Sequence, residues 1–452
     1  MKLRAAAQAI GAHATGPDVE FTRVETDTRG LTPGCLFVAL RGMHFDGHAF
    51  AAQALQQGAA AVMVAAGSGL DLVPALVVDD TRLALGRLAA WHRACMPARL
   101  AAITGSNGKT TVKEMLAAIC QAEAGEAAVL ATRGNLNNDI GVPLTLLGLT
   151  PAHRYAVIEM GMNHPGELDY LTHLARPDVA LVNNALRAHL EGLGSVRAVA
   201  RAKGEIYAGL RDGGVAILNA DDPHAGLWRE MNLGRRMLCF GHEAHAQVRI
   251  VDEGQDPHAR VVHLLTPAGP ITAMLQVPGA HNRRNAAAAA AAALALDIPA
   301  DAIARGLAAY AGTRGRLQYH ACPGGGQLID DSYNANPDSV LAAIGVLAGQ
   351  PGHRILVLGD MGELGPDAAA LHREVGEKAR AAGIQTLLCL GDLSRNTAQG
   401  FGAGALHCTD MQTLLATLRP ALGASTSVLV KGSRAMRMER VVQSLLKDEP
   451  CS

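Results

Sequence analysis

The fold of this chain is decided by the stretch Leu100-Ala101-Ala102-Ile103-Thr104-Gly105-Ser106-Asn107-Gly108-Lys109-Thr110-Thr111. A short apolar run typical of a buried strand leads into a loop with two glycines, and a helical pattern follows. The helix has apolar side chains at spacings i, i+3, i+4 and i+7, namely Val112, Met115, Leu116 and Ile119. The backbone N–H groups of such a loop and the helix N-terminus converge on phosphate oxygens. The stretch therefore predicts a phosphate site.

Two side chains of the loop carry the predicted chemistry. Lys109 neutralises charge on the outer phosphates of a nucleotide, and the hydroxyl of Thr110 binds Mg²⁺. The other predicted nucleotide contacts in the loop are Gly105, Ser106, Asn107, Gly108 and Thr111. The general pattern G-x-x-x-x-G-K-[ST] has a glycine where this chain has Ile103. An ordinary glycine turn with a solvated lysine therefore stays open as an alternative.

Composition limits the class of protein. A length of 452 residues predicts about three domains. Lys and Arg (40) nearly balance Asp and Glu (41), which argues against a nucleic-acid partner and makes any anion site local. No membrane span is expected, because the longest apolar run, Ala286 to Leu296, is far shorter than the ~20 residues that a span needs. This alanine-rich run predicts a packed helix instead.

The cysteines and the N-terminus predict a cytoplasmic protein. The first residues lack the continuous apolar region and the small-residue cleavage site of a signal peptide. The eight cysteines form no Cys-x-x-Cys pair, so we expect reduced thiols rather than zinc or redox chemistry. They are Cys35, Cys95, Cys120, Cys239, Cys322, Cys389, Cys408 and Cys451.

Three domains are predicted, over residues 1–98, 99–312 and 313–452. In the second and third, strand-like runs alternate with helical stretches, which is typical of parallel α/β sheets. An alternating pattern over 247–277 predicts the far edge of the second sheet. The fold class is thus α/β, with a central parallel-sheet ATPase domain that carries the phosphate loop and a C-terminal domain resembling a dinucleotide fold. The strand-like runs are Cys35 to Leu40, Ala60 to Val64, Ala75 to Val78, Tyr155 to Ile158, Val179 to Val182, Val215 to Leu218, Gln327 to Asp330, Arg354 to Leu358, Thr386 to Leu390 and Ser427 to Val430.

Three residues outside the loop are candidate metal ligands. Glu159 ends a predicted strand, where nucleotide enzymes of this layout present a carboxylate to the metal. His189 follows the next strand and opens on the same edge, although a structural hydrogen-bonding role is the alternative. Lys203 lies in the middle of the apolar face of a helix predicted over 196–210. Its ammonium either extends to solvent, or its pKa is lowered and the amine captures CO2 as a carbamate that binds Mg²⁺.

These residues together resemble the Mur ligases, a family of ATP-dependent amide-bond ligases of peptidoglycan precursor synthesis. The loop is similar to the family's shortened phosphate loop, which accepts a residue other than glycine at Ile103. The resemblance implies ATP and two Mg²⁺ ions as cofactors. It also implies that Thr110, Glu159, His189 and a carbamylated Lys203 bind metal. The implied catalytic residues are Lys109, Lys203 and His189.

The resemblance covers nearly the whole chain and implies further binding residues. Asp27, Thr28 and Arg29 look like the segment that holds the UDP end of a substrate. Asn282 corresponds to an adenine contact, and Arg316 and Asp331 to ATP contacts from the third domain. The predicted contacts with the other substrate groups are Asn137, Asn138, Asn334, Lys431 and Arg434.

Two predictions concern the third domain's local structure. Asn336-Pro337 has a plain structural role as the N-cap and first residue of a helix. A second helix is predicted to start at Ser433, between Lys431 and Arg434. Its buried stripe consists of Met438, Val441, Val442 and Leu445.

The stretch from Asp330 to Pro337 resembles the branch of the family that adds D-alanyl-D-alanine to UDP-N-acetylmuramoyl-tripeptide. The expected reaction joins this dipeptide to the free carboxyl of the tripeptide through an acyl phosphate, and the expected enzyme is a monomer. A folylpolyglutamate-synthetase-like ligase and a nucleotide-binding regulator without turnover are the alternatives. The third peptide residue, diaminopimelate or lysine, stays open. One departure is Asn183 to Ala188, where the family usually has Thr-Asn-Ile-Gly-x-Ala.

Overall fold

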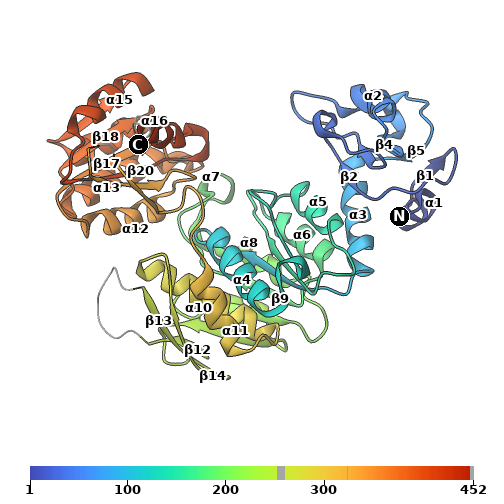
Figure 1. The fold of residues 1–452 in the computed structure, drawn as a ribbon, viewed down its shortest axis with the longest axis horizontal. Coiled ribbons are helices and arrows are strands. Elements are labelled where there is room, and N and C mark those ends of the chain that lie inside the picture. The colour runs from blue at the N-terminus through green and yellow to red at the C-terminus, as the bar shows by residue number, and fades with distance from the viewer. Residues whose placement is uncertain (252–259, 323, 448–452) are drawn as a thin grey trace.

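The computed structural model describes residues 1–251, 260–322 and 324–447, which form three sheet-centred units. Figure 1 shows the N-terminal unit in blue and the C-terminal unit in orange and red, each against a different side of the central unit. The two outer units stand apart from each other in this view.

The N-terminal unit has a sheet with strand order β1-β5-β4-β3-β2, in which only β1 runs antiparallel to its neighbour. Its apolar core includes Leu3, Phe21 and Leu76, all without solvent exposure. Its strands are β1 (His13–Thr15), β2 (Val24–Glu25), β3 (Leu36–Val38), β4 (Ala61–Ala65) and β5 (Ala75–Val78). Its helices are α1 (Leu3–Ile10), α2 (Ala51–Gln56) and α3 (Thr81–Ala94).

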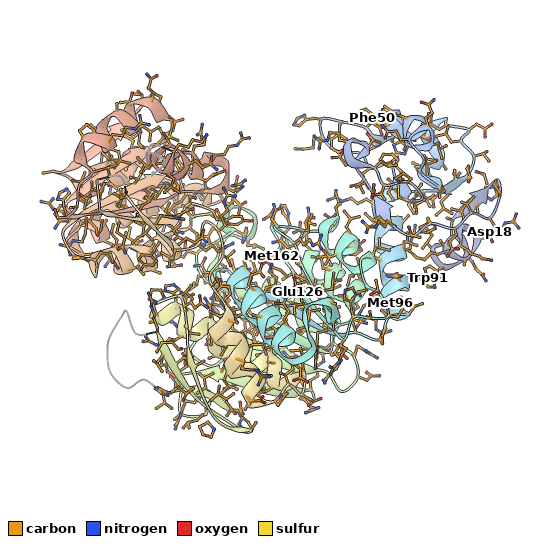
Figure 2. All side chains as sticks on the ribbon, in the orientation of Figure 1. Asp18, Phe50, Trp91, Met96, Glu126 and Met162 are labelled. Atoms are coloured by element: carbon orange, nitrogen blue, oxygen red, sulfur yellow. The ribbon has the colours of Figure 1, made fainter. Side chains whose placement is uncertain are left out.

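Helix α3 connects this unit to the central one. Asp80 caps its first turn by accepting from the N–H groups of Arg82 and Leu83. Trp91 near its end packs with the N-terminal core, whereas Met96 just beyond it packs against the central core. Both side chains are labelled in Figure 2, where the helix descends onto the central unit.

The central sheet has the strand order β14-β13-β12-β11-β10-β9-β6-β8-β7, and all its pairs from β7 to β12 are parallel. The antiparallel strands β13 and β14 form the far edge, as the alternating pattern predicts. Its strands are β6 (Arg99–Thr104), β7 (Val129–Ala131), β8 (Tyr155–Glu159), β9 (Val179–Val182), β10 (Val215–Asn219), β11 (Arg236–Gly241), β12 (Val248–Ile250), β13 (Val261–Thr266) and β14 (Gly269–Met274). Its helices are α4 (Lys109–Ala124), α5 (Gly141–Leu147), α6 (Glu167–Ala175), α7 (Leu190–Leu193), α8 (Val196–Gly204), α9 (Ala225–Met231), α10 (Ala280–Ala295) and α11 (Ala300–Ala309).

Successive residues of β6 point into two different cores, so helices cover both faces of this sheet. Ala101 and Ile103 pack with α4, α10 and α11, whereas Leu100 and Ala102 pack with α5 and α6 on the other face. The alanine run predicted as a packed helix lies in α10, where every residue from 286 to 293 has no solvent exposure. Because both faces of the central sheet are buried, strands such as β6 are apolar at successive positions.

The C-terminal sheet has the order β15-β16-β20-β17-β18-β19, with only β15 antiparallel. It is the second parallel α/β unit that the sequence predicts. Its strands are β15 (Gln318–Ala321), β16 (Gln327–Asp331), β17 (His353–Gly359), β18 (Thr386–Leu390), β19 (Ala405–Cys408) and β20 (Thr426–Lys431). Its helices are α12 (Pro337–Ala348), α13 (Ala368–Ala381), α14 (Ser394–Phe401), α15 (Met411–Leu418) and α16 (Glu439–Leu446).

Two helix predictions are wrong at their ends. The helix predicted over 196–210 ends at Gly204, and a 3-10 turn over Glu205–Tyr207 follows. The hydroxyl of Thr172 donates to the Ile206 carbonyl, and the nearby chain is so close that a Cβ on Gly209 would lie 2.3 Å from the Thr172 carbonyl oxygen. This packing takes the segment out of α-helical geometry.

The helix predicted to start at Ser433 is also divided. Ser433 begins a 3-10 turn over Arg434–Met436, and Arg437 then adopts a left-handed conformation with φ of 50° before α16 starts at Glu439. The predicted stripe is nevertheless buried, since Met438, Val441, Val442 and Leu445 all belong to the C-terminal core. Asn336 caps α12 with Pro337 in its first turn, as predicted.

The seven described cysteines are free, and Cys451 lies outside the described residues. Within the described part of the chain, no helix has both the length and the apolar character needed to cross a bilayer.

Candidate functional site

A cavity of about 1070 Å³ lies where the three units meet. The phosphate loop forms one wall with Ser106 to Lys109, and Glu159 and His189 lie on the same cavity. Helix α3 contributes Arg82 and Leu83 from the N-terminal unit. The C-terminal unit adds Arg316, Asp331, Tyr333, Asn334, Asn336, Lys431 and Arg434. Met162, which follows β8 in the central unit, also lines the cavity and is labelled near the middle of the molecule in Figure 2.

The phosphate loop forms as the sequence predicts, between β6 and α4. Gly108 has a φ of 78°, and an added Cβ would lie 2.5 Å from Oδ1 of Asn285 and 2.6 Å from Nδ2 of Asn183. Only glycine fits such a position. The Lys109 ammonium donates to the carbonyls of Gly105 at 2.6 Å and Ser106 at 3.2 Å. Burial lowers the pKa of Lys109, while the charge of Glu159 raises it.

Two asparagines that the sequence reasoning did not assign hold the loop in shape. Asn183 donates through Nδ2 to the Asn107 carbonyl at 2.9 Å, and Asn184 accepts from the Asn107 N–H at 2.9 Å. The side-chain oxygen of Ser106 also accepts from the Leu186 N–H at 2.9 Å. The atypical stretch at 183–188 is therefore the support of the phosphate loop, and the paired asparagines were its only visible signal.

Glu159 ends β8 and is almost fully buried, with 2% exposure. Its backbone N–H donates to the hydroxyl of Thr132, and its Oε1 accepts from Nδ2 of Asn137 at 2.7 Å. Its Oε2 is buried and has no hydrogen-bond partner among the described residues. A buried carboxylate oxygen without a partner is costly in a protein, which marks it as a position for a cation.

His189 caps α7 in the left-handed region, with φ of 58°. Such a conformation is uncommon outside glycine and occurs at functional sites. Its Nδ1 lies 2.7 Å from Oε2 of Glu363, which comes from the C-terminal unit. Burial lowers the pKa of His189 despite this carboxylate, and the charges of Lys203 and Lys109 lower it further. The imidazole is therefore held in the neutral form that ligates metals.

Lys203 has 1% exposure on α8, so the predicted buried position is confirmed. This low exposure argues against extension of the ammonium to solvent. Burial lowers the pKa of Lys203 well below its ordinary value, and the charge of Lys109 adds to this effect. Burial thus favours the neutral amine at this position.

The oxygen donors near the phosphate loop bear on the predicted Mg²⁺ site. No group of three or more His, Cys, Asp and Glu side chains in the described ranges is placed to hold a metal ion. The unpartnered Oε2 of Glu159 and the hydroxyl of Thr110 are nevertheless hard oxygen donors, which Mg²⁺ prefers. Mg²⁺ usually takes only one or two protein carboxylates and completes its shell with water and substrate phosphates. These residues therefore fit Mg²⁺ bound together with a nucleotide.

The C-terminal unit reaches the loop through Arg316. Its guanidinium donates to Oγ1 of Thr110 at 3.0 Å and lies over the ring of Tyr333, 4.4 Å from the ring centre. Asp331 and Lys431 form a buried pair at 2.5 Å from neighbouring strands β16 and β20. Burial raises the pKa of Asp331, although the Lys431 ammonium opposes the rise.

The remaining substrate predictions have local partners. Asn334 accepts through its backbone carbonyl from Lys431 and through Oδ1 from the Arg434 N–H. Asn138 accepts through Oδ1 from the N–H of Gly141, the first residue of α5. Asn282 donates to the Pro278 carbonyl at the start of α10 and lies on the cavity wall.

Asp27, Thr28 and Arg29 are not brought together with the other predicted residues. They lie in a 3-10 turn of the N-terminal unit, and none of the three lines the central cavity. Arg29 and Asp27 form an exposed ion pair at 2.5 Å, and the hydrogen bonds from Arg29 lower the pKa of Asp27 to about 2.

The fold and this cavity define a three-unit enzyme that handles nucleotides around a phosphate loop. Three family models match the chain: the Mur ligase family catalytic domain over residues 20–93, the Mur ligase middle domain over 103–293 and the Mur ligase glutamate ligase domain over 315–434. The chain belongs to the Mur ligase family.

Its relatives share nearly their whole length with it. It is 47% identical to the UDP-N-acetylmuramoyl-tripeptide--D-alanyl-D-alanine ligase of Escherichia coli over 96% of both chains. It is 42% identical to the enzyme of the same name from Haemophilus influenzae over 98% of both chains. A crystal structure of MurF from Acinetobacter baumannii matches with a TM-score of 0.91 and 35% identity over 98% of both chains.

More distant structures separate the alternatives. MurF ligase of Thermotoga maritima, solved with ADP, matches with a TM-score of 0.82 and 26% identity over 94% of this chain and 97% of that chain. The folylpolyglutamate synthase of Mycobacterium tuberculosis matches with 16% identity, a TM-score of 0.65 and coverage of 82% and 95%, which shows a shared fold alone.

Proposed function

We propose that this chain is an ATP-dependent ligase that joins D-alanyl-D-alanine to the free carboxyl of UDP-N-acetylmuramoyl-tripeptide, in peptidoglycan precursor synthesis. The observation that carries the proposal is the 47% identity, over 96% of the chain, to an enzyme named for these two substrates. A single cavity bounded by the phosphate loop and by both outer units suits a reaction that brings three substrates together.

The reaction needs an activated carboxyl, because a free carboxylate and an amine do not condense in water. The tripeptide carboxylate attacks the γ-phosphorus of ATP, and ADP leaves with the electrons of the broken P–O bond. The amine of the dipeptide attacks the resulting acyl phosphate, and the tetrahedral intermediate loses phosphate and a proton to give the amide. Catalysis therefore rests on placing charged groups in a site that excludes water.

The loop and Arg316 supply the positive charge for phosphoryl transfer. The ammonium of Lys109 exchanges the carbonyls of Gly105 and Ser106 for phosphate oxygens, and the loop's N–H groups hold the remaining phosphate oxygens. Arg316 approaches from the C-terminal unit, beside Asp331. Asn282, on the cavity wall, contacts the base.

The dipeptide is held by the C-terminal unit. Arg434 lies at the cavity with its guanidinium partly exposed, and Lys431 lies beside it in a buried pair with Asp331. One of these two cations binds the dipeptide carboxylate, and Asn334 contacts its backbone. Asn137 and Asn138, which also line the cavity, contact the tripeptide in this proposal.

Mg²⁺ would be held by Thr110, Glu159 and His189, and when bound it neutralises phosphate charge during transfer. Lys203 would take part as a carbamate, formed when its neutral amine adds to CO2 and releases a proton. This change turns a buried amine into an anionic oxygen donor near His189. One Mg²⁺ ion would be bound by Thr110, Glu159 and His189, and a second by the Lys203 carbamate.

We propose domain boundaries between residues 98 and 99 and between residues 312 and 313. In the first domain, Asp27, Thr28 and Arg29 hold the UDP end of the substrate, outside the central cavity. We further propose that the enzyme acts as a monomer. A cytoplasmic location suits its free thiols and its use of ATP.

Phosphate release tests the proposal. We expect release only when ATP, UDP-tripeptide and D-alanyl-D-alanine are all present, and much slower ligation of D-alanine, L-lysine or glutamate. Parallel assays with diaminopimelate- and lysine-containing tripeptides identify the natural third residue. A single amino acid as the best acceptor would move the chain to another branch of the family, and ATP binding without turnover would make it a regulator.

A further inference from the structure

Arg187 joins the loop after β9 to two helices of the C-terminal unit. Its Nε and one terminal nitrogen donate to Oδ1 of Asp338 at 3.0 and 2.7 Å, and its backbone N–H donates to Oδ2 at 2.8 Å. Its other terminal nitrogen donates to Oε2 of Glu374 at 2.8 Å. Asp338 lies in the first turn of α12 and Glu374 in α13, so one guanidinium binds both helices.

The arrangement is more than a surface ion pair. The side chains of Arg187 and Asp338 are only 25% and 23% exposed, so solvent screens them weakly. Hydrogen bonds between charged groups are stronger than neutral ones, and a lysine ammonium cannot reproduce the several fixed donors of a guanidinium. The contact therefore differs from the exposed ion pairs, which contribute little.

The loop that carries Arg187 is also the support of the phosphate loop. Asn184 and Leu186 bind Asn107 and Ser106, as described above, and His189 follows two residues later. On the other side, Asp338 lies two residues after Asn336, whose Nδ2 donates to Oδ1 of Asn107 at 2.7 Å. Arg187 thus lies between the phosphate loop and the start of α12, where the two units touch.

We propose that Arg187 is a positioning residue that seats the C-terminal unit on the phosphate loop and so brings Arg316, Asp331 and Lys431 to the nucleotide. The inference rests on the proposed function only for its kinetic consequence. When the seated arrangement is less populated, every ligand that needs both units binds more weakly by the same factor. A ligand held by the N-terminal unit alone is unaffected.

Two measurements without turnover test this inference. Arg187→Ala and Asp338→Asn are compared with the wild type for binding of a non-hydrolysable ATP analogue by calorimetry and for radius of gyration by small-angle X-ray scattering. We expect the dissociation constant to rise about ten- to a hundredfold in both variants, the range for lost charged hydrogen bonds. We also expect a larger radius of gyration in both. Arg187→Lys should recover only part of the affinity.

The matched control is Arg373→Ala, one residue before Glu374. Arg373 is exposed and donates to Gln399 within the same unit, so its removal takes away a charge without touching the contact between units. The control should bind the analogue like the wild type. The double variant Arg187→Ala/Asp338→Asn should bind the analogue no more weakly than the single variant with the lower affinity, because the two changes remove the same interaction.

Folding is monitored by thermal unfolding, and Glu374→Gln replaces Arg187→Ala if that variant does not fold. Wild-type analogue affinity or a wild-type radius of gyration in folded variants would overturn the inference. Additive losses in the double variant would also overturn it. A missing ligation activity in the wild type would instead count against the proposed function, since neither binding nor scattering depends on turnover.

Discussion

The guanidinium of Arg316 donates to the hydroxyl of Thr110, although the two residues lie 206 positions apart and belong to different units of the fold. Thr110 is the predicted Mg²⁺ ligand of the phosphate loop. The same arginine lies over Tyr333, which fixes the plane of its charged group. The contact shows how closely the C-terminal unit approaches the nucleotide site.

Replacing Arg316 by alanine should lower kcat/KM for ATP by about 10² to 10³, the loss expected from removing one fixed charge at a phosphoryl-transfer site. Steady-state phosphate release measures the effect. Arg314→Ala is the matched control, because Arg314 is exposed and does not line the cavity. Equal effects of the two changes would contradict a direct role for Arg316.

Lys109→Ala should abolish most product formation, with a loss of about 10² to 10³ or more in kcat. Its ammonium already binds two carbonyls of the loop, so a melting temperature is needed to show that the variant keeps the fold. Near-normal turnover in a folded Lys109→Ala protein would reject the nucleotide assignment of the loop.

Lys203→Ala should lose most activity, and a small carboxylate such as formate should restore part of it by occupying the place of the carbamate. The buried position provides the physical reason, because an uncompensated cation there is unfavourable. Intact-mass measurement under bicarbonate checks the added carboxyl group. Wild-type turnover of Lys203→Ala, with the native lysine unmodified, would exclude the carbamate.

Arg29→Ala should weaken UDP-tripeptide binding and leave the affinity for an ATP analogue nearly unchanged, because Arg29 lies in the N-terminal unit and away from the cavity. Calorimetric titration of each ligand separates the two effects. A loss confined to the ATP analogue would contradict the assignment of this segment to the UDP end.

Stability should depend on pH through His281. Its Nε2 is buried without a partner among the described residues, and burial, with Arg284, Lys431 and Arg283 adding to it, lowers the pKa to about 4. An unfolded histidine has a pKa near 6.5, so the unfolded chain binds the proton first as pH falls. The free energy of unfolding should therefore decrease between pH 6.5 and about 4, by up to about 3 kcal/mol.

Chemical denaturation across this pH range measures the dependence, with His281→Gln as the comparison. The glutamine variant should show a smaller decrease, because it has no proton to take up there. Equal pH dependence of the two proteins would mean that other groups cause the loss.

The fold could be predicted where the pattern is local. The strand, loop and helix from Leu100 onward depend on residues next to one another, and so does the cap at Asn336. The buried face of α8 was predicted for the same reason. Its early end was not, because the Thr172 hydroxyl that binds the Ile206 carbonyl comes from another helix, 34 positions away.

The candidate site could be predicted only in part, and the difference again lies in sequence separation. Glu159, His189 and Lys203 were found by their places at strand ends and on an apolar helix face, although their metal-binding roles stay predictions. The support of Asn107 by Asn183 spans 76 positions, and the contact of Arg187 with Asp338 spans 151. No local pattern relates such pairs, so the only sign of them in the sequence was the unusual stretch from Asn183 to Ala188.

The alanines of α10 have a consequence for how this protein can change. A run of identical small residues looks like a segment with little information, yet every alanine from 286 to 293 has no solvent exposure. A larger side chain there overpacks the core and typically costs 1–3 kcal/mol, roughly, in stability. The same helix begins with Asn282 and Asn285 at the cavity. This compositionally simple segment therefore tolerates little change in side-chain size, and it lies in the same helix as two residues of the cavity wall.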